Sequence, residues 1–135
     1  MHYAPGERFA RHHDFFDPKH PGFSGELAKS GQRVSTFLIY LNRNFLGGET
    51  EFPRLRLNHK GEPGDGLMWS NLDPTGAPEY RTVHAGLPPI VGEKWLFCNG
   101  SESAKQSNRQ HWSGGVRANL LRSRKRTRWV AGRAD

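Results

Sequence analysis

The stretch "GQRVSTFLIYLN", residues 31–42, decides the fold class of this chain. Gly31 and Asn42 bound it as turn residues, and apolar and β-branched side chains fill its centre. Because these residue types favour extended backbone, the stretch predicts a buried strand. The side chains that make this pattern are Val34, Thr36, Phe37, Leu38, Ile39 and Leu41.

Short strand-like segments recur on the C-terminal side of this stretch. In "NFLGGETEFPRL" (44–55), Gly47 and Gly48 permit the positive φ of a tight turn, and the run that follows resumes in extended form until Pro53, which predicts a hairpin-like reversal. Clusters of Gly, Pro and Asp separate the remaining candidates. Those candidates are "DGLMWSNL" (65–72), "RTVHAG" (81–86) and "EKWLFCN" (93–99). Strands at this spacing predict an all-β sandwich or barrel-like double sheet.

Composition sets limits on size and chemistry. With 135 residues and 34% apolar content, the chain predicts one domain, and 16 glycines with 9 prolines suit many short strands. Cys98 is the single cysteine, which excludes an internal disulfide framework and a thiolate cluster, so a metal would need imidazole and carboxylate ligands. No apolar run approaches the length of a bilayer span, and the first residues lack the apolar core of a signal peptide.

The net charge of +7 is concentrated at the C-terminal end. Residues 1–104 hold 11 Lys or Arg against 12 Asp or Glu, a net charge of −1, whereas residues 105–135 hold 9 against 1, a net charge of +8. The segment 105–135 is also polar and without a sustained period, apart from a short helix expected around "VRANLLRSRKR" (116–126). We therefore predict a domain over residues 1–104 followed by a basic, poorly ordered tail.

A candidate metal site lies near the start of the chain, in "ARHHDFFD" (10–17). If this segment is extended, His12 and Asp14 project from one face of the strand and His13 from the other. A metal held by two imidazoles and one carboxylate requires a second histidine, and His84 lies in a later strand-like segment. The other histidines available are His2, His13, His20, His59 and His111.

Lys94 follows His84 by ten residues. If the two residues belong to neighbouring antiparallel strands joined through "LPPIVG" (87–92), the ammonium group faces the same cavity as the imidazole. Plainer readings are also open: His12 and Asp14 as a surface-loop pair, and Lys94 as a surface lysine beside Trp95, which like Trp69 is expected in the core.

Five elements together resemble the catalytic domain of the prolyl 4-hydroxylases, in the iron(II) and 2-oxoglutarate-dependent dioxygenase superfamily, over roughly residues 3–97. In family order they are "YAPGERFARHHDFF", "GQRVSTFLIYLN", "GGETEFP", "GDGLMW" and "HAGLPPIVGEKW". The pair H-x-D alone is weak evidence, whereas the five elements together are specific.

The resemblance implies a role for each matching residue. His12, Asp14 and His84 are the expected iron ligands, and Lys94 is the expected partner of the distal carboxylate of 2-oxoglutarate. Thr50 resembles a hydroxyl that assists this lysine. Tyr3 and Tyr40 match aromatic residues that line the co-substrate pocket in the family. Arg33 matches a basic residue near the peptide groove.

The resemblance also implies a fold and a reaction. The fold is an all-β double-stranded β-helix, a jelly-roll-like pair of sheets, truncated at the N-terminus because family members usually carry helices and a further strand ahead of the "Y-x-x-G" element. The reaction is hydroxylation of peptidyl proline with Fe(II), 2-oxoglutarate and O2, releasing succinate and CO2, with ascorbate as the reductant. The segment "LFCNGSES" (96–103) predicts a last strand shortened by glycine and serine.

Two alternatives of other classes remain open. The chain could be a catalytically defective metal- or peptide-binding fragment of this fold, or an oxygenase directed at nucleic acid through its basic tail. The expected partner is otherwise a proline-containing peptide or protein, with no membrane segment in the chain. Without a targeting segment, a complete chain is expected in the cytoplasm, and a fragment of a longer eukaryotic protein could belong to the endoplasmic reticulum.

Overall fold

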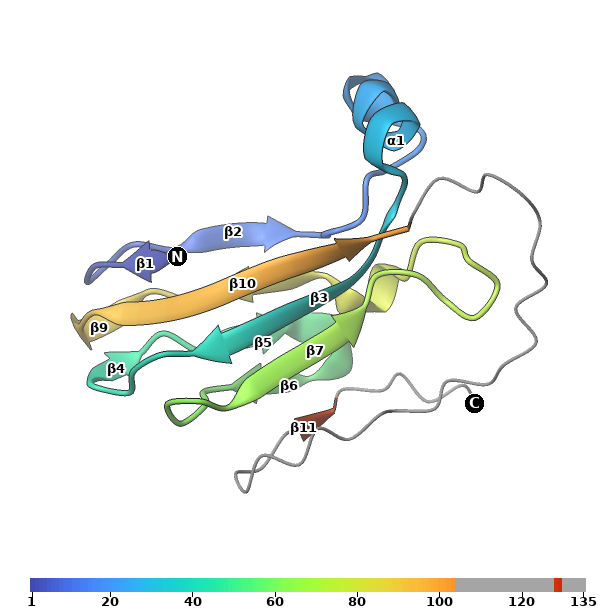
Figure 1. Ribbon diagram of the computed structural model, residues 1–135. Coiled ribbons are helices and arrows are strands. Elements are labelled where there is room, and N and C mark those ends of the chain that lie inside the picture. Colours follow the sequence, from blue (N-terminus) through green and yellow to red (C-terminus); the bar gives the residue numbers. More distant parts are fainter. Residues whose placement is uncertain (104–127, 130–135) are drawn as a thin grey trace.

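Two facing β-sheets make up the part of the chain that the computed structural model describes, residues 1–103 and 128–129. In the larger, five-stranded sheet the strand order is β1-β10-β3-β7-β11, and in the four-stranded sheet it is β2-β8-β5-β6. A further pair, β4-β9, lies beside them. Figure 1 shows β10, β3 and β7 side by side, with β5 and β6 behind them. This all-β, jelly-roll-like architecture agrees with the double-stranded β-helix predicted from the sequence.

The strands are short, with two exceptions in the larger sheet. The five-stranded sheet comprises β1 (His2–Tyr3), β3 (Arg33–Tyr40), β7 (Gly66–Ser70), β10 (Lys94–Glu102) and β11 (Arg128–Trp129). The four-stranded sheet comprises β2 (Phe9–His12), β5 (Thr50–Phe52), β6 (Leu57–His59) and β8 (His84–Gly86), and the remaining pair comprises β4 (Phe45–Gly47) and β9 (Pro89–Gly92).

Helical structure is confined to short connections. The single α-helix of the described residues, α1 (Ser24–Ser30), lies beyond one end of the sheets (Figure 1). Three 3-10 turns accompany it: η1 (Pro21–Phe23), η2 (Pro53–Leu55) and η3 (Tyr80–Thr82). No helix among the described residues is long and apolar enough to span a membrane.

The strand predicted at residues 31–42 is confirmed as β3, at the centre of the larger sheet. Because side chains alternate along a strand, Thr36, Leu38 and Tyr40 are buried toward the second sheet, whereas Phe37 is exposed on the other face. The core between the sheets consists of Tyr3, Leu38, Tyr40, Phe52, Leu67, Trp69 and Leu96.

The hairpin predicted at residues 44–55 is wrong. Gly47 and Gly48 do have positive φ, at 72° and 73°, but the strands on either side of them belong to different sheets. β4 pairs with β9, and β5 pairs with β6 and β8. The two glycines therefore move the chain from one sheet to another, which a turn pattern alone does not distinguish from a reversal.

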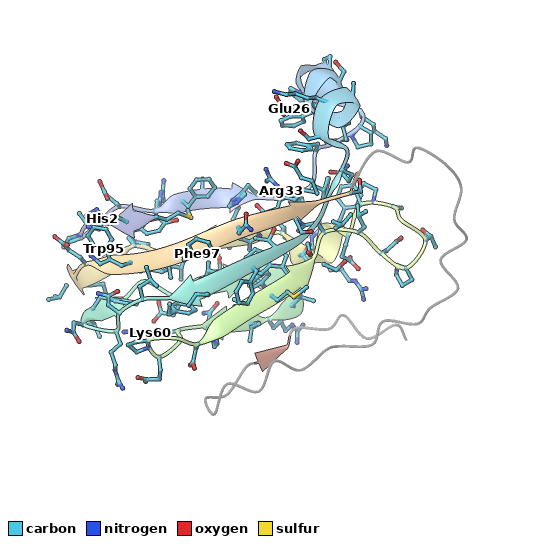
Figure 2. All side chains as sticks on the ribbon, in the orientation of Figure 1. His2, Glu26, Arg33, Lys60, Trp95 and Phe97 are labelled. Atoms are coloured by element: carbon cyan, nitrogen blue, oxygen red, sulfur yellow. The ribbon has the colours of Figure 1, made fainter. Side chains whose placement is uncertain are left out.

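The last predicted strand is longer than the sequence indicated. β10 continues through Gly100 and Ser101 to Glu102 and pairs with β3 along most of its length. Backbone pairing with a complete central strand therefore compensates for the weak β propensity of glycine and serine. The expectation of a shortened strand is wrong, and so is the burial expected for Trp95, which is exposed and stacks on His2. Figure 2 shows Trp95 and Phe97 on the outward face of β10.

The predicted boundary after residue 104 stays a prediction. Beyond Ser103 the structure describes only β11, which pairs in parallel with β7 at the edge of the larger sheet. The helix expected at residues 116–126 lies outside the described residues.

Candidate metal centre

Two strands of the smaller sheet bring together the three residues predicted as metal ligands. His12 on β2 and His84 on β8 are directly opposite each other in an antiparallel pair, so both imidazoles lie on the same face of the sheet. Asp14 follows β2 in a bend, not in continuous strand as expected, but its carboxylate still reaches the two rings. One ligand atom from each residue lies within 4.8 Å of the others.

Backbone carbonyls fix the orientation of both imidazoles. The distance from Nδ1 of His12 to the carbonyl oxygen of Ala10 is 2.8 Å, and that from Nδ1 of His84 to the carbonyl oxygen of Thr82 is 3.0 Å. A carbonyl only accepts, so each Nδ1 carries a proton, and Nε2 of each ring is directed toward Asp14. The two Nε2 atoms lie 3.3 Å and 3.7 Å from the Asp14 carboxylate.

The carboxylate of Asp14 stays ionised in this setting. Burial by itself would raise its pKa, but the interactions with His12, His84 and the hydroxyl of Thr36 outweigh burial and lower the pKa to about 2. Burial also lowers the pKa of His84, which favours its neutral, metal-binding form. Two imidazole nitrogens and one carboxylate therefore converge on one point, which is the donor set of a 2-His-1-carboxylate metal site.

A buried lysine lies at the other end of the same cavity. Lys94 is 0% exposed, and its Nζ makes no hydrogen bond to any of the described residues. The ammonium group faces the rings of Tyr3 and Tyr40, at 5.3 Å and 5.8 Å from their centroids. Burial lowers the pKa of Lys94 to about 8, with Glu49 opposing the shift, so the amine is still mostly protonated at neutral pH.

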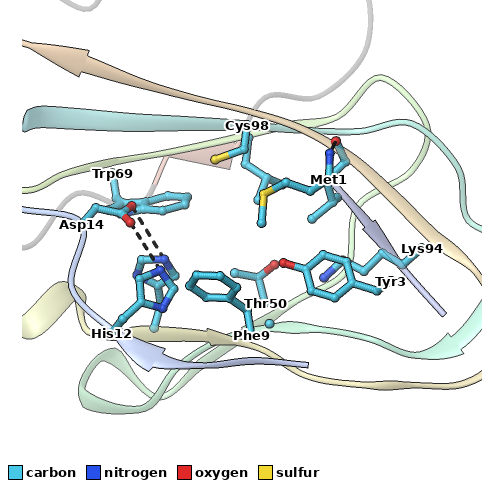
Figure 3. A pocket seen from close by; sticks show the side chains of 13 residues that line it. Met1, Tyr3, Phe9, His12, Asp14, Thr50, Trp69, Lys94 and Cys98 are labelled. Carbon is cyan, nitrogen blue, oxygen red and sulfur yellow. Dashed lines mark hydrogen bonds and ion pairs between the residues drawn. The ribbon is translucent and has the colours of Figure 1, made fainter. Parts of the chain in front are cut away.

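An unpaired buried ammonium group is costly, and this favours an anionic ligand. The cavity is about 130 Å³, far more than the roughly 10–15 Å³ that one water needs. Figure 3 shows His12 and Asp14 at one end of the cavity and Lys94, Tyr3 and Thr50 at the other. A small molecule that chelates a metal through one end and carries a carboxylate at the other fits these two groups.

The geometry by which Lys94 reaches the cavity differs from the prediction. β8 and β10 are not neighbours: β8 lies in the four-stranded sheet and β10 in the five-stranded sheet. His84 and Lys94 therefore face each other across the space between the sheets. The segment between them forms β9, which pairs with β4, and this is how ten residues carry the chain from one sheet to the other.

Three of the remaining predicted residues surround Lys94. Tyr3 is paired with Lys94 in the register of β1 and β10. The hydroxyl of Tyr40 lies 2.9 Å from Oγ1 of Thr50 and donates to the carbonyl oxygen of His59 at 3.0 Å. Burial raises the pKa of Tyr40 to about 12, so its hydroxyl stays protonated.

Arg33 and His13 lie close to the ligands without facing them. Arg33 donates from Nη1 to the carbonyl oxygen of Asp14 at 3.1 Å, and its guanidinium group lies over the ring of Phe16. His13 turns away from the metal ligands, as the alternation of the strand predicts, and its Nε2 lies 3.3 Å from the carbonyl oxygen of Tyr80. The predicted role of Arg33 in substrate binding stays a prediction.

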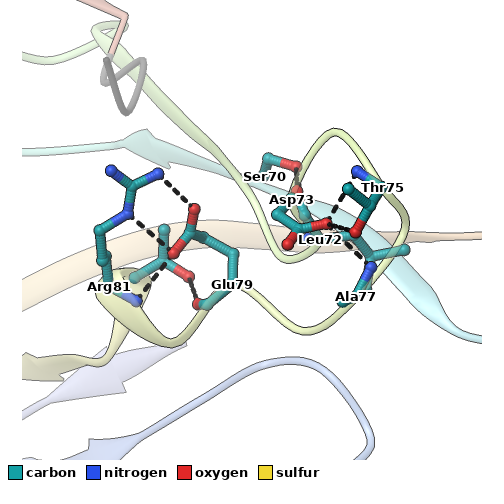
Figure 4. A network of polar contacts seen from close by, with 8 residues as sticks. Ser70, Leu72, Asp73, Thr75, Ala77, Glu79 and Arg81 are labelled. Atoms are coloured by element: carbon teal, nitrogen blue, oxygen red, sulfur yellow. Dashed lines mark hydrogen bonds and ion pairs between the residues drawn. The ribbon is translucent and has the colours of Figure 1, made fainter. Parts of the chain in front are cut away.

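The loop that leads into β8 is held by its own polar contacts (Figure 4). The carboxylate of Glu79 accepts from the backbone and the guanidinium group of Arg81, and Thr82 donates from Oγ1 to the carbonyl oxygen of Glu79 at 2.8 Å. These contacts fix η3, whose last residue supplies the carbonyl group that orients His84.

Some residues of the site were not predicted from the sequence. Thr36 and Asn71 form a buried hydrogen-bonded chain to Asp14, and Cys98 lines the cavity from β10. The alternation along β3 could have indicated Thr36, because it is a polar residue on the face that Leu38 and Tyr40 bury. No local pattern distinguishes Asn71 from a turn residue.

Comparison with known proteins agrees with this geometry. The family model of the 2OG-Fe(II) oxygenase superfamily matches residues 1–99. The chain belongs to this superfamily. Among its relatives, prolyl 4-hydroxylase subunit alpha-1 of Gallus gallus is 35% identical over 94 residues, and a putative prolyl 4-hydroxylase of Acanthamoeba polyphaga mimivirus is 35% identical over 97 residues. These alignments cover 70% and 71% of the chain but only 18% and 40% of the two relatives.

A solved structure has a fold similar to that of this chain. The viral collagen prolyl hydroxylase of Paramecium Bursaria Chlorella virus-1, in complex with 2OG, matches with a TM-score of 0.56 at 31% sequence identity. The match covers 73% of the chain and 53% of the viral protein. The family resemblance predicted from the five sequence elements is therefore confirmed.

Proposed function

We propose that this chain is an iron(II)- and 2-oxoglutarate-dependent dioxygenase that hydroxylates peptidyl proline. One observation carries the proposal: a single cavity contains a possible metal site and an unpaired cation. The side chains of His12, Asp14 and His84 meet at one end of the cavity, and the ammonium group of Lys94 lies at the other. The superfamily to which the chain belongs is named for the metal and co-substrate that fit these groups.

Iron would be held by Nε2 of His12, a carboxylate oxygen of Asp14 and Nε2 of His84, with its remaining positions open. The chemistry that iron and 2-oxoglutarate supply when bound is oxidative decarboxylation, in which one atom of O2 enters succinate, CO2 is released and the other atom enters a C–H bond of the substrate. Ascorbate as a reductant is inferred from the family resemblance.

Lys94 would bind the distal carboxylate of 2-oxoglutarate. A charge-assisted contact of this kind is worth roughly 1.5–3 kcal/mol, and inside a closed cavity it also ends the isolation of the buried ammonium group. Tyr3 and Thr50 line this end of the cavity, and Tyr40, which is not among the lining residues, holds Thr50 by a hydrogen bond between their hydroxyls. Together these residues position the co-substrate and exclude water.

The choice of a proline-containing peptide as substrate is supported by the similarity to prolyl 4-hydroxylases. The expected shortening of the last strand favours a catalytically defective fragment, and the full length of β10 removes this support. A nucleic-acid substrate would depend on the basic segment 105–135, whose charge is its only support.

Turnover of 2-oxoglutarate to succinate, measured with Fe(II) and a panel of proline-containing peptides, tests the proposal. We expect peptide-stimulated turnover that His12→Ala abolishes and that His13→Ala reduces no more than about threefold, because His13 faces Tyr80 and not the other ligands. If the wild-type protein binds Fe(II) and 2-oxoglutarate but produces no succinate with any peptide, the proposed activity is wrong and a binding role replaces it.

A further inference from the structure

A buried chain of hydrogen bonds ends on the carboxylate of Asp14. Thr36 donates from Oγ1 to Oδ2 of Asp14 at 2.6 Å, and Asn71 donates from Nδ2 to Oγ1 of Thr36 at 3.0 Å. Thr36 is 3% exposed and Asn71 is 0% exposed, and both come from the larger sheet, β3 and the residue after β7. The hydrogen bonds therefore run from the larger sheet, which does not carry His12 and His84, to the carboxylate of Asp14.

The polarity of this chain follows from the number of protons available. A threonine hydroxyl has one proton and two lone pairs, and an ionised carboxylate only accepts. Because the amide N–H of Asn71 can only donate, Thr36 accepts from it through a lone pair, and the hydroxyl proton of Thr36 points to Asp14. The donation from Asn71 therefore strengthens the donation from Thr36 by polarising the hydroxyl.

Asn71 is well fixed for this task. Its backbone N–H donates to the carbonyl oxygen of Val34 at 2.9 Å, and its own carbonyl oxygen accepts from the N–H of Glu79 at 2.9 Å. These two backbone hydrogen bonds hold the residue after β7 against β3 and against the loop that leads to His84.

We propose that Asn71 and Thr36 are positioning residues for the metal, which select the carboxylate oxygen that Asp14 presents to it. Thr36 donates to Oδ2, which lies 3.7 Å from Nε2 of His84, and Oδ1 lies 3.3 Å from Nε2 of His12. Because the donated hydrogen bond draws electron density from Oδ2, Oδ1 is the oxygen directed to the metal. Asp14 then binds through one oxygen, and a further metal position stays open for co-substrate or O2. This inference rests on the proposed function, since it concerns the same metal site.

Metal binding in the absence of co-substrate and substrate tests the inference without using activity. Co(II) is titrated anaerobically into the full chain, and both its dissociation constant and its visible absorption spectrum are recorded. Thr36→Val, which keeps the shape and removes the hydroxyl, is expected to raise the dissociation constant about 10–100-fold and to change the spectrum as Oδ2 becomes free to bind. Thr36→Ser, which restores the hydroxyl, should return both to within about threefold of wild type.

Asn71 is tested through its dependence on Thr36. Asn71→Ala should weaken Co(II) binding about 3–10-fold, and in a Thr36→Val background it should add less than a further twofold, because its partner is already absent. Thr50→Val is the matched control: it removes a buried hydroxyl at the Lys94 end of the cavity, and Co(II) affinity should be unchanged while 2-oxoglutarate affinity falls.

The outcomes separate the two ideas. If wild-type protein binds no Co(II), the proposed function itself fails. If wild-type protein binds Co(II) and folded Thr36→Val binds it with the same constant and spectrum, the metal site stands and the positioning role is wrong. Should Thr36→Val not fold, the comparison of Thr36→Ser with Thr36→Ala decides in the same way, and additive effects of Asn71→Ala and Thr36→Val would exclude a role of Asn71 through Thr36.

Discussion

Lys94 shows at the scale of a single residue how this protein gives up stability for function. Its ammonium group is buried without a hydrogen bond to the described residues, and its pKa is lowered to about 8 from an ordinary value of 10.5. Since the unfolded chain binds the proton more tightly than the folded one, the native state is penalised at neutral pH. We expect the penalty to be relieved when an anionic ligand enters the cavity.

Lys94→Met is therefore expected to stabilise the folded protein while removing its affinity for 2-oxoglutarate. The shift in pKa corresponds to a gain on the order of 1–3 kcal/mol in the free energy of unfolding at pH 7. Chemical denaturation measures the first effect, and calorimetric titration of the Mn(II)-loaded protein with 2-oxoglutarate measures the second. A variant that is less stable than wild type, or that still binds the co-substrate, would contradict this account of Lys94.

The same group predicts how co-substrate binding depends on pH. Below about pH 8 Lys94 is protonated, so the dissociation constant of 2-oxoglutarate should be level there, and above pH 8 it should rise toward tenfold for each pH unit as the proton is lost. Titrations with Mn(II)-loaded protein between pH 7 and 9.5 measure this profile. In Lys94→Arg, whose guanidinium group does not titrate in this range, binding should be weaker but level, and a rise equal to that of wild type would assign the effect to another group.

The sequence indicated the candidate metal-binding residues better than the residues that hold them in place. His12, Asp14, His84 and Lys94 could be predicted because each lies in a motif whose spacing is local. The hydrogen bonds of Asn71 to Thr36 and of Thr36 to Asp14 join residues separated by 35 and 22 positions. Such contacts depend on strand register, which the local sequence does not determine.

At the scale of elements, strand identity was more predictable than strand pairing. β3, β7 and β10 lie where apolar and β-branched residues gather, but the partners of β4 and β5 differ from the expected hairpin. Pairing here depends on how the chain passes between sheets, and glycines with positive φ mark several of these passages. The passage between β9 and β10, at Gly92, is the most crowded because the pair β4-β9 closes directly over it.

Gly92→Ala is expected to destabilise the protein by roughly 2–4 kcal/mol. Gly92 has a φ of 76°, and an added Cβ would overlap the carbonyl oxygen of Asn44, a backbone atom that cannot move alone. Gly76→Ala is the matched control, since its φ is 85° but nothing lies within 4 Å of the added Cβ, so only the strain of about 1 kcal/mol applies. Chemical denaturation of both variants measures the difference, and equal losses would show that crowding at the β4-β9 pair is unimportant.

At the scale of the whole molecule, the site is formed by two sheets that face each other. The smaller sheet supplies His12 and His84, and the larger sheet supplies Lys94 and the residues that hold Asp14. The sequence predicted that His84 and Lys94 share a cavity, but it assigned them to neighbouring strands of one sheet. Spacing along a chain cannot distinguish side-by-side strands from strands that face each other, because both bring the residues within reach.

The same architecture predicts which part of the chain the site can lose. The described residues that line the cavity lie between Met1 and Cys98, and after Ser103 the structure describes only a two-residue strand, β11, at the edge of β7. A chain that ends at Ser103 should therefore bind Co(II) and 2-oxoglutarate within about twofold of the full chain, with a small loss of melting temperature from the removal of the two-residue edge strand β11. Its net charge should change from +7 to −1, so affinity for polyanions should disappear. Calorimetric titration and thermal melting of both chains measure these effects. A large loss of metal affinity or of melting temperature would show that residues 104–135 are a structural part of the domain.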